Sequence, residues 1–249
     1  MEELRVERLS KDFGAIRVLR NISFSVTSEE RRIVIIGPNG AGKTTLFNLI
    51  SGELPCSGGS IHLFGRDITK MSCYRRTRLG LARTFQISDL FPHFTLMENV
   101  LLALQAHDSC SYQMLRPRRA YVHLYEKAED LLKEMRIYEK RDYPIASLSH
   151  GETRLTEIIL GIAAGPQILL LDEPTSGLTS SEGVWLAKLI QHLLKNITIL
   201  MIEHDMNIAF DFADRMIVLH QGEVVADGRP EEIRTNPKIR EIYLGTFDG

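Results

Sequence analysis

The sequence predicts an α/β fold with a mostly parallel β-sheet, and three observations support this prediction. An apolar run at 32–36 leads into a glycine-rich loop and then into a helical pattern at 46–50. Apolar strands recur at 168–171 and 197–202, and such strands, when helices separate them, form parallel sheets that are covered on both faces. Alternating residues near the N-terminus, at 4–9 and 22–26, predict an antiparallel β-subdomain beside this core.

The glycine-rich loop fits the pattern G-x-x-x-x-G-K-[ST]. Its residues are Gly37, Pro38, Asn39, Gly40, Ala41, Gly42, Lys43, Thr44 and Thr45. Glycines allow successive N–H groups to point at phosphate oxygens, and the following helix N-terminus adds positive potential. We expect Lys43 to reach the β- and γ-phosphates of a nucleoside triphosphate and Thr44 to hold Mg²⁺. An ordinary glycine-rich turn needs no Lys-Thr pair at its end, so the chain is predicted to bind a nucleotide.

Composition limits the class of protein further. The chain has 249 residues with a hydrophobic fraction of 44%, which suits one large domain over 1–249. Lys+Arg 30 against Asp+Glu 32 gives a formal net charge of -2, so overall charge provides no argument for nucleic-acid or acidic-membrane binding. The three cysteines form no CxxC pattern and indicate free thiols. No signal peptide and no transmembrane segment is predicted, so any membrane span must come from another polypeptide.

The remaining helices and strands are predicted from hydrophobic periodicity and from the positions of glycine and proline. A further strand is expected at 61–64 and a hairpin at 215–219 and 223–226. Helical patterns are expected at 94–105, 121–136, 154–164, 184–194 and 206–213. The basic cluster at 75–83 could contact nucleic acid, but a solvated helix face is the favoured interpretation. The polar segment 107–119 is expected to be a loop of unknown function.

Two acidic residues follow the apolar strand 168–171, namely Asp172 and Glu173. Ligands bind beyond the carboxyl ends of strands in open α/β sheets. We therefore expect Asp172 to complete the Mg²⁺ site with Thr44, and Glu173 to polarise an attacking water. His204 follows the strand 197–202 in the same way, and it could contact the γ-phosphate or hold that water.

Three further features remain ambiguous when only their residue types are considered. Gln86 ends the run 83–86 and is of a type common on surfaces, and Phe13 could be a core ring or a stacking face for adenine. Ser149 could simply cap the following helix, or it could form an anion site with the helix N-terminus, where Gly151 permits close approach. A second anion site in a chain that already has a phosphate loop needs an explanation.

These motifs occur in the order seen in ATP-binding subunits of ABC transporters, which the chain resembles over nearly its whole length. The resemblance implies a P-loop NTPase core with an inserted α-helical subdomain at about 87–165. It implies a head-to-tail dimer in which one subunit closes over ATP held by 37–45 of the other. The closing residues would be Ser149, His150, Gly151 and Glu152. By the same resemblance, Phe13 stacks on adenine, His204 is the switch histidine, and Gln86 reaches the metal and the attacking water.

A finer resemblance is to the branched-chain amino acid type, through the runs 85–86, 90–92, 98–100 and the ending 236–245. Importers of urea or other amides and the lipopolysaccharide-export ATPase share parts of this pattern. The resemblance implies a second ATP-binding subunit (identical or a paralogue), an integral membrane permease and, as a candidate partner, an extracytoplasmic solute-binding protein. It also implies ATP and Mg²⁺ as ligands, a peripheral location on the cytoplasmic face of the membrane, and no nucleic-acid partner.

Three positions depart from the family pattern. His150 replaces a glycine, Leu160 stands where relatives usually have Arg, and Thr179 replaces the usual Asp or Asn of its loop. None of the three departures removes a residue that is expected to touch phosphate or metal, so activity is expected to survive. Phe91, Phe94 and Leu96, if exposed, would suit a docking surface for a permease helix, but they could equally be core residues.

The alternatives are a soluble ABC-type ATPase acting on nucleic acid or ribosomes, the ATPase of a lipid or lipopolysaccharide exporter, and a small-molecule kinase with the same phosphate loop. The first usually joins two nucleotide domains or carries a long coiled coil, and this chain has neither. A kinase would not need the run 148–152.

Overall fold

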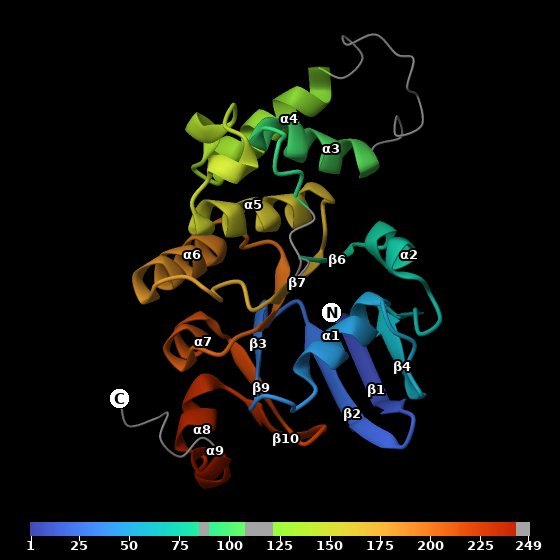
Figure 1. The fold of residues 1–249 in the computed structure, drawn as a ribbon. Coiled ribbons are helices and arrows are strands. Elements are labelled where there is room, and N and C mark those ends of the chain that lie inside the picture. Colours follow the sequence, from blue (N-terminus) through green and yellow to red (C-terminus); the bar gives the residue numbers. More distant parts are fainter. Residues whose placement is uncertain (85–89, 108–121, 243–249) are drawn as a thin grey trace.

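A computed structural model of the chain describes residues 1–84, 90–107 and 122–242, and it contains two β-sheets (Figure 1). The smaller sheet is antiparallel, with strand order β2-β1-β4-β5. Its strands are β1 (Glu2–Phe13), β2 (Ile16–Thr27), β4 (Gly58–Leu63) and β5 (Arg66–Asp67). The predicted N-terminal antiparallel sheet is therefore confirmed.

The larger sheet has the order β10-β9-β3-β8-β7-β6, and its strands are parallel except for β10, which pairs antiparallel with β9. The strands are β3 (Arg32–Ile36), β6 (Leu81–Arg83), β7 (Ile168–Asp172), β8 (Thr198–Ile202), β9 (Arg215–His220) and β10 (Glu223–Gly228). The mostly parallel sheet is confirmed, whereas β6 is too short for its periodicity to be recognised in the sequence.

Helices cover both faces of this larger sheet (Figure 1). The helices are α1 (Lys43–Ser51), α2 (Cys73–Arg78), α3 (Leu96–His107), α4 (Val122–Glu134), α5 (His150–Ala163), α6 (Ser180–Leu193), α7 (Met206–Phe212), α8 (Pro230–Thr235) and α9 (Pro237–Ile242). Helices α5 and α6 begin about one turn earlier than the apolar patterns predict. In each case a Ser or Thr forms a capping box with a Glu three residues later, which extends the helix through polar residues.

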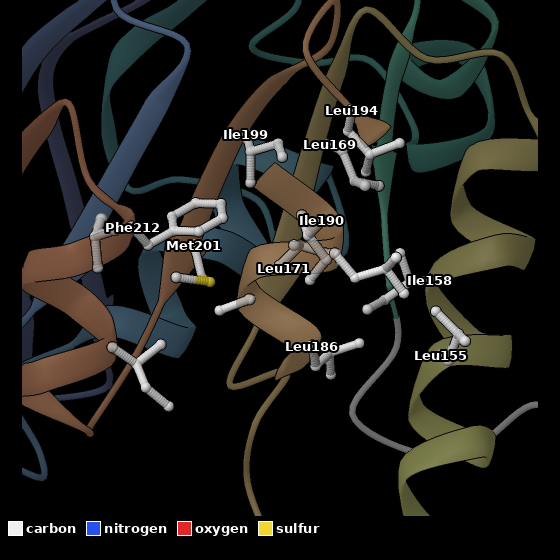
Figure 2. Close-up of a cluster of buried hydrophobic side chains, with 14 of the residues drawn as sticks. Leu155, Ile158, Leu169, Leu171, Leu186, Ile190, Leu194, Ile199, Met201 and Phe212 are labelled. Atoms are coloured by element: carbon white, nitrogen blue, oxygen red, sulfur yellow. The ribbon is translucent and has the colours of Figure 1, made fainter. Parts of the chain in front are cut away.

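Alternate residues of the central strands serve two separate cores. In β7, Ile168 and Leu170 pack with α1 and the smaller sheet. Leu169 and Leu171 pack on the opposite face, where α5 and α6 supply Leu155, Ile158, Leu186 and Ile190 (Figure 2). Every residue of β7 and β8 is buried, as expected for parallel strands covered on both faces. The carboxyl ends of these strands are thereby held rigidly at one edge of the sheet.

The three helices α3, α4 and α5 form a layer that caps the central sheet, with α5 between the other two helices and the strands (Figure 1). Leu124, Ala128 and Leu132 of α4 are buried in this layer, as the amphipathic pattern predicts. Phe91 and Phe94 are exposed and stack on each other, with ring centroids 5.3 Å apart. Leu96 is fully buried and belongs to the core, so it does not contribute to a docking surface.

The basic cluster at 75–83 is not a solvated face throughout. Arg75 and Arg78 are exposed, but Arg76 is only 2% exposed. Its guanidinium donates to the carbonyls of Leu49 and Ile50, each at 2.7 Å, near the end of α1. Carbonyls in the last turn of a helix lack intrahelical partners, so Arg76 caps α1. The expectation of a solvated helix face is therefore wrong for Arg76, and equally for Arg83, which is described below.

Within the described residues, no helix is long and apolar enough to cross a membrane. Phe85, Gln86, most of the segment 107–119 and the end of the tail motif at 243–245 lie outside the described residues.

Candidate functional site

The glycine-rich loop connects the end of β3 to the start of α1, as the motif predicts. Gly40 and Gly42 have φ angles of 81° and 102°, a left-handed region that side-chain-bearing residues rarely adopt. A Cβ atom on Gly37 would lie 2.2 Å from the carbonyl oxygen of Leu219 in β9. No side chain caps the start of α1, where Gly42 is the N-cap. The first amides of α1 are therefore available to an anion.

Lys43 folds back over this loop. Its Nζ donates to the carbonyls of Gly37 at 2.7 Å and Pro38 at 3.1 Å, and the residue is only 6% exposed. Burial lowers the pKa of Lys43, while the carboxylates of Glu173 and Asp172 oppose that change. The ammonium group is thus held against the loop by weak neutral acceptors. Phosphate oxygens would be stronger acceptors for it.

The loop, Glu173 and His204 line a single cavity of about 360 Å³, to which β2 contributes Val18. The structure therefore brings together three sets of residues that lie far apart in the sequence. Each set follows a parallel strand, namely β3, β7 or β8. This convergence is expected because the carboxyl ends of parallel strands meet at one edge of the sheet.

Glu173 and His204 contact each other directly. Nε2 of His204 lies 2.5 Å from Oε1 of Glu173. Glu173 has a φ of 50°, unusual for a residue with a side chain, and its N–H donates to the carbonyl of Ile202 at 3.0 Å. This backbone bond joins the end of β7 to the end of β8, so the acid is held in an uncommon conformation beside the histidine.

Asp172 ends β7 with a side chain that is 0% exposed. Its Oδ2 accepts from Nη2 of Arg83 at 2.8 Å, while its Oδ1 is buried without a hydrogen-bond partner among the described residues. Burial raises the pKa of Asp172, and the Arg83 cation opposes that rise. A free, buried carboxylate oxygen at this place fits a hard cation with its waters, because Mg²⁺ prefers oxygen ligands.

Glu203 is a site residue that the sequence interpretation missed. It is 3% exposed, and its Oε1 accepts from the N–H of His204 at 2.8 Å. Its Oε2 accepts from Oγ1 of Thr175 at 2.8 Å. The signal that could have revealed it is an acid placed directly after an apolar strand, the same signal that marked Asp172.

The run 149–152 lies at the start of α5. Ser149 is the N-cap: its Oγ accepts from the N–H of Glu152 at 3.3 Å, and Glu152 accepts in return from the N–H of Ser149 at 2.9 Å. None of these four residues lines the cavity of the phosphate loop. The structure shows the capping role, and an added anion-binding role stays a prediction that needs a second subunit.

The structure explains how two residues that depart from the family pattern, His150 and Thr179, are accommodated. A Cβ atom on Gly177 would lie 3.1 Å from Cε1 of His150, so this ring packs against the loop after β7. Thr179 is the N-cap of α6, and its Oγ1 contacts Glu182 Oε2 at 2.7 Å. Threonine therefore keeps the capping function that Asp or Asn would provide.

Phe13 lies at the end of β1 and is 46% exposed. Nζ of Lys11 lies 4.9 Å from its ring centroid. The ring is not among the residues that line the cavity of the phosphate loop. It is available for stacking, but adenine contact stays a prediction, and the role of Gln86 falls outside the described residues.

The fold and the phosphate loop define a nucleotide-binding α/β protein. A family model described as ABC transporter matches residues 19–176. The chain belongs to the ABC transporter family, as an ATP-hydrolysing subunit, which confirms the resemblance found in the sequence.

Similar proteins support this assignment over almost the full chain. The high-affinity branched-chain amino acid transport ATP-binding protein BraF of Pseudomonas aeruginosa is 37% identical over 250 residues, covering 97% of both chains. The protein of the same description named LivG from Escherichia coli (strain K12) is 36% identical over 249 residues, again covering 97% of both.

A solved ATP-binding cassette of an ABC transporter has a TM-score of 0.86 and 30% identity, covering 98% of this chain and 100% of the other. A cassette in its ADP conformation has a TM-score of 0.84 and 29% identity, covering 98% of this chain and 99% of that one. These similarities do not favour the nucleic-acid, lipid-export and kinase alternatives. The burial of the Arg76 and Arg83 side chains also leaves fewer exposed cations in the basic cluster at 75–83, which argues against a nucleic-acid patch there.

Proposed function

We propose that this chain is the ATPase of an importer for branched-chain amino acids or related small polar solutes. It would act on the cytoplasmic face of the membrane, where a separate permease provides the transport path and an extracytoplasmic solute-binding protein delivers the solute. The relatives described as high-affinity branched-chain amino acid transport proteins support this substrate class, because they align with 97% of the chain.

The observation that carries the proposed mechanism is the shared cavity of the phosphate loop, Glu173 and His204. In this cavity Gly37–Thr45 bind the phosphates of ATP, with Lys43 on the β- and γ-phosphates. Glu173 takes a proton from the attacking water as general base, and His204 holds the water or the γ-phosphate through the nitrogen that now contacts Glu173. Phe13 stacks on the adenine from the adjoining β-hairpin.

Mg²⁺ would be held by Thr44 at the start of α1, by Asp172 at the end of β7, and by Gln86. When bound, the ion neutralises negative charge on the phosphates. The free Oδ1 of Asp172 is the structural observation that favours this assignment.

A second subunit would complete each site. The residues Ser149, His150, Gly151 and Glu152 do not line the phosphate-loop cavity of their own chain, and Ser149 and His150 are exposed at the start of α5. In a head-to-tail pair, identical or paralogous, they would close over the ATP of the partner. A structural relative described as a dimeric post-hydrolysis state, with ADP and Pi bound, has a TM-score of 0.76 and supports such a pair.

The permease would dock in a groove formed by α2, β6, α3 and α5. This groove has a volume of about 290 Å³, and apolar residues including Leu81, Leu90 and Leu160 line it. Leu160 stands where relatives usually have Arg, so the groove is more apolar at this position. An apolar groove suits the apolar face of a permease helix. The exposed pair Phe91 and Phe94 would extend this surface.

We further propose that residues 1–249 form a single domain, with a helical subdomain at about 87–165. A cluster of buried side chains supports the single domain, because it joins α3, α4 and α5 to the central sheet.

Uptake of radiolabelled leucine tests the proposed function. Deleting the gene for this chain from its source organism should abolish high-affinity leucine uptake, and the wild-type chain should restore it. The variant Glu173→Gln should not restore it, although the protein accumulates normally. Full leucine, isoleucine and valine uptake in the deletion strain would contradict the proposed substrate class, and the same assay with urea or amides would then identify the alternative solute.

A further inference from the structure

Glu203 directly follows β8 and has no part in the mechanism proposed above. Three donors converge on its buried carboxylate. Oε2 accepts from the hydroxyl of Thr175 at 2.8 Å, while Oε1 accepts from the N–H of His204 at 2.8 Å and of Asp205 at 3.2 Å. An apolar residue at this position would leave two backbone amides and a buried hydroxyl without their acceptor, which is costly in a protein interior.

These bonds join two loops that each carry one member of the catalytic pair. Thr175 lies two residues after Glu173, in the loop that leaves β7. His204 and Asp205 form the loop that leaves β8, and Asp205 in turn caps α7 by accepting from the N–H of Asn207 at 2.9 Å. Glu203 is therefore hydrogen-bonded to both loops. The catalytic side chains of the two loops contact each other, because Nε2 of His204 lies 2.5 Å from Oε1 of Glu173.

Two cavities adjoin this pair. Glu173 and His204 line the cavity of the phosphate loop and also a second cavity of about 210 Å³. Glu203 and Thr175 line only the second cavity. Glu203 is therefore not among the residues that line the space where ATP would bind.

We propose that Glu203 is a positioning residue for hydrolysis. By its hydrogen bonds to Thr175, His204 and Asp205, it keeps the side chain of His204 in contact with that of Glu173. This inference rests on the roles proposed above for Glu173 and His204. Burial also raises the pKa of Glu203, in keeping with a group that is enclosed rather than exposed to the nucleotide.

A pair of variants separates positioning from charge. Glu203→Ala removes all three bonds and should lower kcat by about 100-fold, the size of effect expected when catalytic groups shift by about 1 Å. Glu203→Gln keeps a carbonyl oxygen for the two amides and an NH₂ group that can donate to the Thr175 hydroxyl, so kcat should stay within about fivefold of wild type. In both variants the KM for ATP should change less than about twofold, because the phosphate loop is untouched.

A double variant tests whether Glu203 influences hydrolysis through His204. If Glu203 acts through His204, then Glu203→Ala added to His204→Ala should lower kcat less than it does in the wild-type background. Glu223→Ala, at an exposed acid on β10, is the control and should leave kcat unchanged. A Glu203→Ala enzyme with wild-type kcat, a Glu203→Gln enzyme as impaired as Glu203→Ala, or a fully additive double variant would each overturn the proposal.

Two further measurements keep the test decisive. If Glu203→Ala does not fold, Thr175→Val removes one of the three bonds at nearly constant volume, and it should lower kcat by about tenfold. A wild-type rate for this folded variant would also overturn the proposal. Glu173→Gln separates this inference from the proposed function. Retained hydrolysis there would remove the assigned base, whereas loss of hydrolysis there with normal activity in Glu203→Ala would refute only the role of Glu203.

Discussion

Arg83 donates a hydrogen bond through Nη2 to Oδ2 of Asp172 at 2.8 Å, and the two side chains are only 6% and 0% exposed. Nη1 of Arg83 also donates to Oε2 of Glu53 at 3.1 Å and contacts Oδ1 of Asn48 in α1. The guanidinium thus ties the end of β7 to the helix that follows the phosphate loop. It also lines the groove in which we place the permease.

Replacing Arg83 with Met should lower the free energy of unfolding by about 3–5 kcal/mol at pH 7. The substitution leaves Asp172 as a buried carboxylate without its cation, and breaking a buried pair in this way has a cost of that size. Because burial raises the pKa of Asp172 and Arg83 opposes the rise, the variant should recover part of the loss when the pH is lowered to about 5.

Urea unfolding at the two pH values measures this effect. Arg75→Met is the matched control, because Arg75 is exposed on α2 and its replacement should change stability by no more than about 0.5 kcal/mol. Equal losses for the two variants would show that the Arg83–Asp172 pair does not stabilise the fold.

The order of the catalytic motifs and the central sheet could be predicted because they depend on local sequence. A glycine-rich loop between a strand and a helix, or acids directly after an apolar strand, can be recognised without tertiary information. Apart from Asp172 and Thr198, the strands β7 and β8 are apolar, so their burial on both faces could be predicted directly.

Other features depend on contacts between distant segments. Arg83 and Asp172 are 89 positions apart, and Thr175 and Glu203 are 28 apart. No sequence periodicity relates such pairs, so the buried state of Arg83 and the role of Glu203 were not predicted. The proposed composite site is a different case, because the residues that would complete it belong to a second chain.

Glu173→Gln should leave ATP binding intact and trap an ATP-dependent dimer. Glutamine has the shape of glutamate but cannot accept the proton of the attacking water, so the closed pair would persist once formed. Light scattering after gel filtration, with and without ATP, measures the dimer, and phosphate release measures hydrolysis. Hydrolysis at the wild-type rate would mean that Glu173 is not the base.

Ser149→Arg should abolish hydrolysis while the monomer still binds ATP. A long cation at the start of α5 would block the approach of this surface to the nucleotide of a second subunit, whereas Ser149 does not line the cavity of its own chain. The substitution also removes the N-cap of α5, which by itself costs about 1 kcal/mol of stability.

Ser149→Ala is therefore the control, because it removes the same cap without adding bulk. Arg and Ala variants of similar stability but different hydrolysis would separate steric exclusion from loss of the cap. If Ser149→Arg hydrolyses ATP at an unchanged rate, the start of α5 does not close over a partner's nucleotide.

Glu203 should make the stability of the protein depend on pH. Burial raises the pKa of its carboxyl, although the hydrogen bond from Thr175 and the nearby His204 oppose the rise. The folded state then binds a proton more tightly than the unfolded state, whose glutamate pKa is about 4.3. The favourable contribution of Glu203 to stability is complete below that value and is lost as the pH rises through the raised pKa of the folded state.

The variant Glu203→Gln cannot titrate at this position. The difference in free energy of unfolding between wild type and variant should therefore change in favour of the variant between about pH 4 and pH 7. Urea titrations at several pH values in this window measure the difference, and a constant difference would show that the folded carboxyl titrates normally.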